Sequence, residues 1–143
     1  MKKKYLIVIA DYYKDISKGL LDSALKKIPI SNSIKIIKVP GVFEIPITIS
    51  KNIKKYDAFL ALGCVIKGET PHFDFISSAS TNAIMDLSIS YKKPIGNGII
   101  TCLNMRQAKA RKKKGAEATG AVISILSQKW ERTLTQKIIL ELS

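Results

Sequence analysis

Residues 58–75 read AFLALGCVIKGETPHFDF, an apolar run that leads into a turn and a second patterned segment. The run from Ala58 to Ile66 has the composition of a strand buried on both faces of a parallel sheet. Thr70 and Pro71 fit the N-cap and the first position of a helix. The segment therefore predicts a strand, a turn with unpaired backbone N–H groups, and a helix in succession.

The predicted turn is a candidate anion site. In open α/β sheets, ligands bind beyond the carboxyl ends of the strands, and a helix N-terminus favours an anion through its unpaired amides and its dipole. His72, the only histidine of the chain, falls near the start of this helix, where the dipole favours a neutral imidazole that accepts a proton. We therefore predict a phosphate-binding turn with a proton-transferring histidine beside it.

Apolar runs alternate with segments of helical period along the chain. The runs that predict strands are Tyr5–Ala10, Ile34–Val39, Ala58–Ile66 and Pro94–Thr101. Helical stripes that predict core faces are Ile16, Leu20, Leu21, Ala24, Leu25 and Ile28, then Ile76, Ala79, Ala83, Ile84 and Leu87, then Ala118, Ala121, Val122, Ile125 and Leu126. Shorter helices are expected from about Glu44 to Lys55 and from Asn104, which can act as an N-cap.

This alternation predicts an α/β protein with one domain over residues 1–143. We expect a flavodoxin-like, three-layer fold, in which a four-stranded, mainly parallel sheet carries helices on both faces. The carboxyl ends of the strands then share one edge, to which the chain delivers Tyr12, Phe43, Glu44 and the turn after Cys64. The rings of Tyr12 and Phe43 can stack on a planar ligand. Glu44 falls at a helix start, where its simplest role is a capping carboxylate.

The charge balance is strongly basic, with a formal net charge of +13. Lysine supplies 21 of the 24 basic residues, in short dispersed runs that lack the arginine-rich or aromatic-interleaved pattern of nucleic-acid readers. We interpret these lysines as solvated surface residues and predict no nucleic-acid partner. Their field can still steer an anionic substrate toward the protein.

The remaining composition is that of an ordinary globular protein, 46% hydrophobic and 24% charged. Cys64 and Cys102 both fall in apolar runs, which predicts small buried side chains rather than a metal site or a disulfide framework. No segment has the length of a membrane span, and Met1–Lys4 leads directly into a predicted strand instead of a signal peptide. We expect a cytoplasmic protein with no membrane contact.

Four segments together resemble the lumazine synthase family. Val39–Pro46 (VPGVFEIP) resembles the family's Val-Pro-Gly-x-aromatic-Glu-Ile-Pro, and Ala61–Phe75 resembles its long central motif, which ends in Gly-x-Thr-Pro-His-Phe-Asp-aromatic. Gln107-Ala108-x-x-Arg111 and Lys114–Ala118 (KGAEA) resemble its last two motifs. The long central motif is the most specific of the four, and the resemblance covers nearly the whole chain.

The resemblance implies a transferase of riboflavin biosynthesis. The implied reaction condenses 5-amino-6-(D-ribitylamino)uracil with 3,4-dihydroxy-2-butanone 4-phosphate to give 6,7-dimethyl-8-ribityllumazine, with release of phosphate and water. It implies no metal and no redox cofactor. It also implies a homo-oligomer, either a homopentamer or a pentamer-based cage, in which neighbouring subunits share each site.

The resemblance also implies roles for individual residues. Tyr12 would stack on the pyrimidine, and the residues implied to bind the ribitylaminouracil are Val42, Phe43, Glu44, Cys64, Val65 and Ile66. Glu69 and Thr70 would offer backbone amides to the butanone phosphate, which Arg111 would clamp. His72 would be the catalytic proton-transfer residue, and Lys114 and Glu117 would complete a charged rim.

The chain departs from the usual family pattern at five places. Asn97 stands where an aromatic residue is usual, which makes one implied wall of the ring pocket polar. Tyr13 and Val42 also differ from the usual residues, the segment between Arg111 and Lys114 is shorter than usual, and only Met1–Lys4 precede the first predicted strand.

Three alternatives stay open from the residues. An archaeal-type riboflavin synthase is disfavoured by the intact central motif. A catalytically weakened homologue would bind a flavin-like ring or serve as a shell protein, which Asn97 favours and the retention of His72, Arg111, Lys114 and Glu44 disfavours. A basic RNA-binding module would show a salt-sensitive affinity for nucleic acid.

Overall fold

The computed structural model of the protein describes residues 2–68, 73–128 and 139–142. Its centre is a four-stranded parallel sheet with the order β2-β1-β3-β4. The strands are β1 (Lys4–Ala10), β2 (Ser33–Val39), β3 (Ala58–Ile66) and β4 (Ile95–Cys102). All four predicted strands are confirmed, and the sheet is parallel throughout rather than mainly so.

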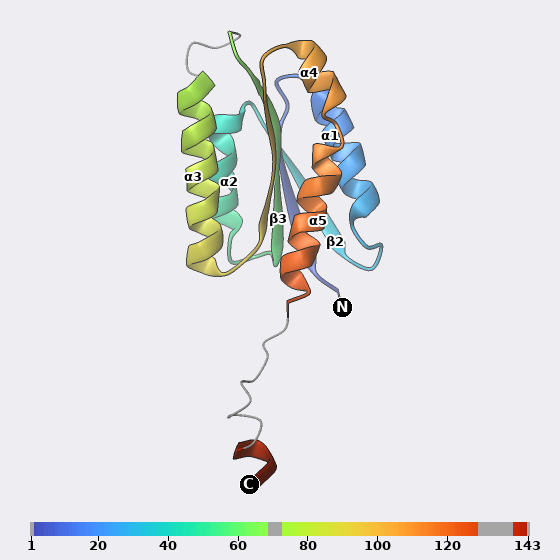
Figure 1. The fold of residues 1–143 in the computed structure, drawn as a ribbon, viewed down its shortest axis with the longest axis vertical. Helices are drawn as coiled ribbons and strands as arrows, with labels where there is room; N and C mark the ends of the chain where they lie inside the picture. Colours follow the sequence, from blue (N-terminus) through green and yellow to red (C-terminus); the bar gives the residue numbers. More distant parts are fainter. Residues whose placement is uncertain (1, 69–72, 129–138, 143) are drawn as a thin grey trace.

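Helices cover both faces of this sheet, which confirms the predicted three layers (Figure 1). On one face lie α1 (Lys14–Lys27), α4 (Met105–Ala110) and α5 (Lys114–Leu126). On the other lie α2 (Ile45–Asn52) and α3 (Phe73–Tyr91), and a short 3-10 turn, η1 (Val42–Glu44), leads into α2.

The core consists of two apolar layers separated by the sheet. All nine residues of β3 are buried, as expected for a central strand covered on both faces. Alternate residues contribute to each layer: Leu60 and Leu62 pack with Leu20 of α1 and Val122 of α5. Phe59, Ala61 and Val65 pack on the opposite side with the apolar face of α2. β3 thereby holds both helical layers in place.

The sequence-based boundaries are close to those observed. Asn104 is the N-cap of α4, and its Oδ1 accepts a hydrogen bond from the backbone N–H of Gln107 at 3.0 Å, which confirms that prediction. The helix expected from Glu44 to Lys55 is shorter and begins after η1. Glu44 is its N-cap residue, but the role of capping carboxylate is wrong, because the side chain makes no capping hydrogen bond within the described residues. The predicted helix start at Thr70 and Pro71 lies outside the described residues.

The predicted core stripes of α3 and α5 are only partly correct. Ile84, Ala118 and Val122 are buried, but Ala79, Ala121 and Ile125 are exposed. Ala121 and Ile125, together with Met85, line a groove of about 310 Å³ between α3 and α5 beside β4, an edge strand of the sheet. The helical period correctly identified these faces as apolar, but one chain alone does not cover them.

Among the described residues, no helix has both the length and the apolar composition needed to cross a membrane.

Candidate active site

Seven of the predicted site residues line one cavity at the carboxyl ends of β1 and β3. The cavity has a volume of about 300 Å³, and we call it the ring cavity. Its predicted lining residues are Tyr12, Val42, Phe43, Glu44, Cys64, Val65 and Ile66. Tyr13, Gly41 and Ile76 also line it. Tyr13 and Gly41 are sequence neighbours of predicted residues. Ile76 lines the cavity from α3, whereas its place in a helical stripe predicted only a core residue.

Two aromatic side chains at the mouth of the ring cavity are exposed. Tyr12 is 71% exposed and Phe43 is 65% exposed, although both are large and apolar. The Tyr12 ring meets the Tyr13 ring edge to face, with centroids 4.8 Å apart. The turn that carries them is held by Ser17, whose Oγ donates to the carbonyl oxygen of Ala10 at 2.7 Å. An exposed aromatic on an anchored turn can stack on a planar ring.

Gly63 allows η1 to lie directly against β3. A Cβ atom at Gly63 would come within 2.9 Å of Val42 Cγ2 and 3.0 Å of Ala10 Cβ. No side chain fits in that space without a shift of its neighbours. The close approach brings Phe43 and Glu44, which follow Val42, to the mouth of the ring cavity.

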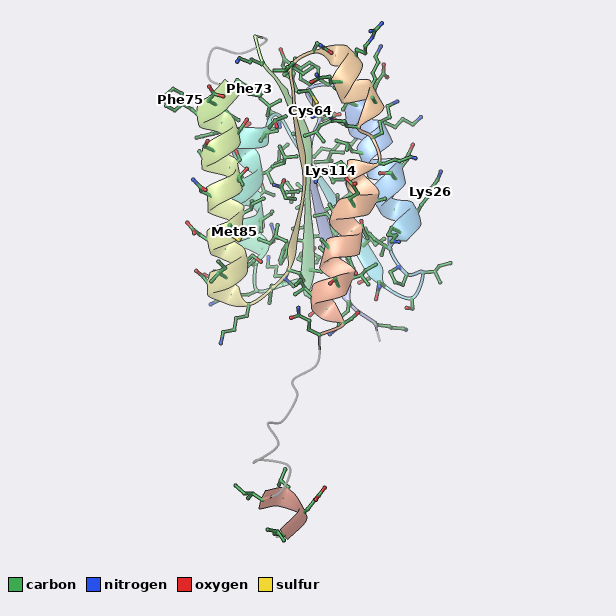
Figure 2. All side chains as sticks on the ribbon, in the orientation of Figure 1. Lys26, Cys64, Phe73, Phe75, Met85 and Lys114 are labelled. Carbon is green, nitrogen blue, oxygen red and sulfur yellow. The ribbon has the colours of Figure 1, made fainter. Side chains whose placement is uncertain are left out.

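Cys64 lines the ring cavity and is 7% exposed. Figure 2 labels it among the side chains of the sheet. Burial, with the neighbouring Cys102 thiol as a smaller cause, raises the pKa of Cys64 to about 12. Its thiol is therefore protonated at neutral pH, and a protonated thiol is a poor nucleophile. Both cysteines are free and buried, as predicted.

Four other predicted residues line a second cavity, of about 460 Å³, beside β4 and the start of α5. These residues are Asn97, Arg111, Lys114 and Glu117, and we call this space the cationic cavity. Lys113 also lines it, so three cationic side chains face one carboxylate. Ile99, Ile100, Thr101 and Ala110 complete the lining. Lys113 is part of a three-lysine run that the sequence alone could not distinguish from other surface lysines.

The position of Arg111 follows from the capping of α4. Gln107 Oε1 accepts a hydrogen bond from the N–H of Leu103 at 2.8 Å, reciprocal to the Asn104 cap. This pair holds the helix start, and Arg111 follows as the C-cap residue. Arg111 Nη1 donates to the carbonyl oxygen of Thr101 at 3.1 Å. The guanidinium is therefore anchored at the end of β4.

Lys114 and Glu117 form an ion pair one helical turn apart, with Nζ and Oε2 separated by 4.0 Å. Both side chains are well exposed, and exposed pairs of this kind contribute little to stability, about 0–1 kcal/mol. Figure 2 shows Lys114 at the start of α5. Its charge remains available to an anion in the cavity.

Asn97 is exposed on β4, and its Oδ1 accepts a hydrogen bond from the backbone N–H of Ile99 at 3.0 Å. The side chain thus satisfies an amide of the edge strand. It supplies a polar wall to the cationic cavity, and it also lines the apolar groove between α3 and α5.

The structure brings the predicted residues together in two groups rather than one. Among the described residues, the ring cavity and the cationic cavity have no lining residue in common. Glu69, Thr70 and the catalytic candidate His72 lie outside the described residues. Within residues 2–68, 73–128 and 139–142, no group of three or more His, Cys, Asp or Glu side chains is placed to hold a metal ion.

The fold and the two cavities define an α/β protein with one cavity lined by exposed aromatic rings and a second lined by three cationic side chains. Residues 2–129 match the sequence profile of the 6,7-dimethyl-8-ribityllumazine synthase family. The chain is 41% identical to 6,7-dimethyl-8-ribityllumazine synthase 1 of Rhodopseudomonas palustris, over 86% of this chain and 83% of the relative. It is 42% identical to the synthase of Methylorubrum populi, over 88% and 82%, and 39% identical to that of Agrobacterium fabrum, over 90% and 97%.

The chain therefore belongs to the 6,7-dimethyl-8-ribityllumazine synthase family. It catalyses the lumazine synthase reaction of riboflavin biosynthesis, the condensation of 5-amino-6-(D-ribitylamino)uracil with 3,4-dihydroxy-2-butanone 4-phosphate. The resemblance in the four sequence motifs is confirmed by these comparisons.

Proposed function

We propose that the ring cavity of one subunit and the cationic cavity of its neighbour form one complete active site in a homopentamer. The observation that carries this proposal is the division of the site residues between two separate cavities of the same chain. In the part of the chain that the structure describes, neither cavity combines exposed aromatic rings with a cluster of cationic side chains. The reaction needs both, because one substrate is a planar ring and the other a phosphate ester.

The apolar groove beside β4 supports an interface at this place. Met85 and Ile125 expose their side chains along it, and contiguous exposed apolar surface marks a site of association. Asn97 lines both this groove and the cationic cavity. A subunit that covers the groove therefore also approaches the cationic cavity. In this proposal residues 1–143 form a single domain. Five such subunits form a pentameric ring, either alone or as part of a pentamer-based cage.

The ring cavity is proposed to bind the ribitylaminouracil. Tyr12 and Phe43 would stack on its pyrimidine, and Val42, Cys64, Val65 and Ile66 would supply the apolar wall. Glu44 would accept hydrogen bonds from the polar substituents of this substrate. The high pKa of Cys64 supports a binding role for its neutral thiol rather than a covalent one.

The cationic cavity is proposed to bind the phosphate of the butanone substrate. Arg111 would grip the phosphate through paired N–H donors, with Lys114 and Glu117 at the rim. The backbone amides of Glu69 and Thr70, which lie outside the described residues, would also donate to it. His72 would transfer protons during imine formation, phosphate elimination and ring closure. The condensation requires no metal and no redox cofactor. We propose cytoplasmic action on these small molecules, with no nucleic-acid or membrane partner.

A dilution experiment tests the shared site. Formation of the lumazine chromophore from both substrates is followed over a range of protein concentrations, while sedimentation velocity reports the oligomeric state at each one. A shared site predicts that activity per subunit falls as the pentamer dissociates. Full activity per subunit in a monomer would contradict the proposal, and no chromophore from an intact pentamer would favour the weakened homologue instead.

A further inference from the structure

We infer that Ser23 of α1 is a positioning residue for the phosphate clamp, because it holds the short turn that carries Arg111 and Lys114. The inference rests on the proposed function in one respect, the assignment of Arg111 and Lys114 to the phosphate. Ser23 lines neither the ring cavity nor the cationic cavity. Its influence on the substrate is therefore indirect.

The turn between α4 and α5 is very short. Arg111 is the C-cap residue of α4, and Lys114 is the first residue of α5. The N-cap residue Lys113 makes no side-chain capping hydrogen bond in the structure. The first amides of a helix have no partner within the helix. Carbonyl oxygens of the turn accept hydrogen bonds from the N–H groups of Lys114 and Gly115, so the N–H of Ala116 is the one that needs an acceptor from elsewhere.

Ser23 supplies that acceptor from a different helix. Its Oγ accepts a hydrogen bond from the N–H of Ala116, the third residue of α5, at 3.0 Å. Such a bond is normally made by the N-cap side chain itself. Here α1 caps α5 through a residue that is 93 positions away in the sequence.

The same hydroxyl also holds the centre of the turn. Ser23 Oγ donates to the carbonyl oxygen of Lys112 at 2.7 Å. The carbonyl oxygen of Leu20, at 3.2 Å, is the weaker alternative, since a hydroxyl has a single hydrogen to donate. Ser23 therefore contacts the backbone on both sides of Lys114, at Lys112 and at Ala116.

Two glycines lie where the turn packs against α1. Gly19 lies one helical turn before Ser23, and the Cγ and Cε atoms of Lys112 occupy the space of a Cβ atom there, at 2.7 and 2.9 Å. A Cβ atom at Gly115 would overlap the carbonyl oxygen of Leu20. The close approach of the turn to α1 therefore requires Gly115, whereas at Gly19 only the flexible Lys112 side chain would have to move. Arg111 at one end of the turn then reaches Thr101, and Lys114 at the other faces the cationic cavity.

Ser23→Ala tests the inference, with Thr119→Val as the matched control. Thr119 Oγ1 lies within hydrogen-bond distance of two carbonyl oxygens, that of Gly115 in its own helix at 3.1 Å and that of Ala24 in α1 at 3.2 Å. Its buried hydroxyl therefore also lies between α5 and α1, but one turn further from Arg111. Both variants lose one hydroxyl between the same two helices. Kinetics are measured for each substrate at a temperature at which circular dichroism shows both variants fully folded.

For Ser23→Ala we expect the KM of the butanone phosphate to rise about three- to tenfold, because the stability that a cap gives a helix start acts here on the residues that bind the phosphate. The KM of the aminouracil should stay unchanged. Thr119→Val is expected to lower thermal stability and to leave both KM values unchanged. The inference is overturned if Ser23→Ala changes neither KM, if it raises both equally, or if Thr119→Val raises the phosphate KM as much.

Arg111→Lys, measured alone and together with Ser23→Ala, separates this inference from the site assignment. If Ser23 acts by positioning Arg111, then Ser23→Ala and Arg111→Lys together raise the KM of the butanone phosphate by less than the product of their separate fold-changes. Additive effects overturn the inference alone and leave the clamp intact. A phosphate KM that does not respond to Arg111→Lys overturns the proposed clamp, and the inference falls with it.

Discussion

Arg111 Nη1 donates to the carbonyl oxygen of Thr101 at 3.1 Å, so the guanidinium spans from the end of α4 to the end of β4. A guanidinium has five N–H donors in a fixed plane. Nη1 contacts the Thr101 carbonyl oxygen and, at 3.9 Å, Cys102 Sγ, so these anchoring contacts use one nitrogen of the group and leave the others for an oxyanion. These contacts restrict the conformations of the Arg111 side chain, so its free N–H donors are held at the cationic cavity before an anion binds.

Arg111→Lys is predicted to weaken binding of the phosphate substrate selectively. Lysine has a single ammonium group and cannot both contact Thr101 and offer a planar pair of donors. Because hydrogen bonds to charged groups contribute about 1.5–3 kcal/mol, the KM of the butanone phosphate should rise about tenfold or more. Steady-state kinetics of chromophore formation measure this. Arg106→Lys, a change on α4 outside both cavities, is the control and should behave as wild type.

Asn97→Phe is predicted to tighten binding of the aminouracil. In the assembled site an aromatic side chain here would add a second stacking wall, worth about 0.5–1.5 kcal/mol. The expected fall in KM is several-fold at most. The substitution also removes the acceptor for the Ile99 N–H, and Asn97→Ala isolates that loss because it adds no ring. An equal KM for the phenylalanine and alanine variants would place position 97 outside the ring site.

The fold was predictable because its signals are local. The unbroken apolar run of β3 marks a strand buried on both faces, and the apolar stripe of α1 marks a helix packed on it. The Asn104 cap was predictable for the same reason, since its partner Gln107 is three residues away. Contacts between residues that are close in the sequence can be predicted from the residue types and their spacing.

The arrangement of the candidate site was only partly predictable. Residues in one turn, such as Phe43 and Glu44, necessarily lie together, and family motifs place Arg111 and Lys114. The separation of Arg111 from the ring cavity depends on how α4 crosses the edge of the sheet, which no local pattern encodes. Ser23 was missed because its partner Lys112 is 89 residues away, and a serine in an amphipathic helix carries no signal of such a bond.

Gly63→Ala is predicted to destabilise the protein and to disturb the ring cavity. The added Cβ would press on Val42 Cγ2 at 2.9 Å, and overpacking of this kind typically costs about 1–3 kcal/mol. The melting temperature should fall and the KM of the aminouracil should rise as η1 moves away from β3. Gly120→Ala is the matched control: its nearest neighbour would be Lys27 Cε at 3.9 Å, so the change should stabilise α5 by roughly 0.5–1 kcal/mol.

The raised pKa of Cys64 predicts a loss of stability in alkali. Folding raises this pKa from 9.0 to about 12, so the unfolded chain releases the thiol proton first as the pH rises. Below pH 9 the thiol is protonated in both the folded and the unfolded state, so its ionisation does not change the free energy of unfolding. Between about pH 9 and 12 the unfolded state binds fewer protons, and the free energy of unfolding falls.

Urea titrations at a series of alkaline pH values measure this loss. The comparison is with Cys64→Ala, which removes the thiol, so that the titration of lysines and tyrosines cancels between the two proteins. The wild type should lose more stability than the variant over this range. Parallel curves for the two proteins would mean that the Cys64 thiol ionises equally easily in the folded and unfolded states.

The shared site predicts that two defective variants complement each other. His72→Ala is expected to slow turnover toward the lower end of the 10²–10⁴-fold loss typical of a missing proton-transfer group, since water or substrate phosphate can replace it in part. Arg111→Ala removes the clamp. In rings co-refolded from equal amounts of both, about a quarter of the interfaces pair an intact His72 with an intact Arg111 across neighbours. Activity should therefore recover to about a quarter of wild type, well above either variant alone.

Rings of wild type mixed with the double variant His72→Ala/Arg111→Ala provide the control. A site shared between neighbours again predicts about a quarter of wild-type activity, whereas a site contained in one chain predicts about half. The two models also differ for the complementing pair, in which a self-contained site recovers nothing. Native mass spectrometry establishes that the rings are mixed. Mixed rings without recovered activity, together with half activity in the control, would show that each chain clamps its own phosphate.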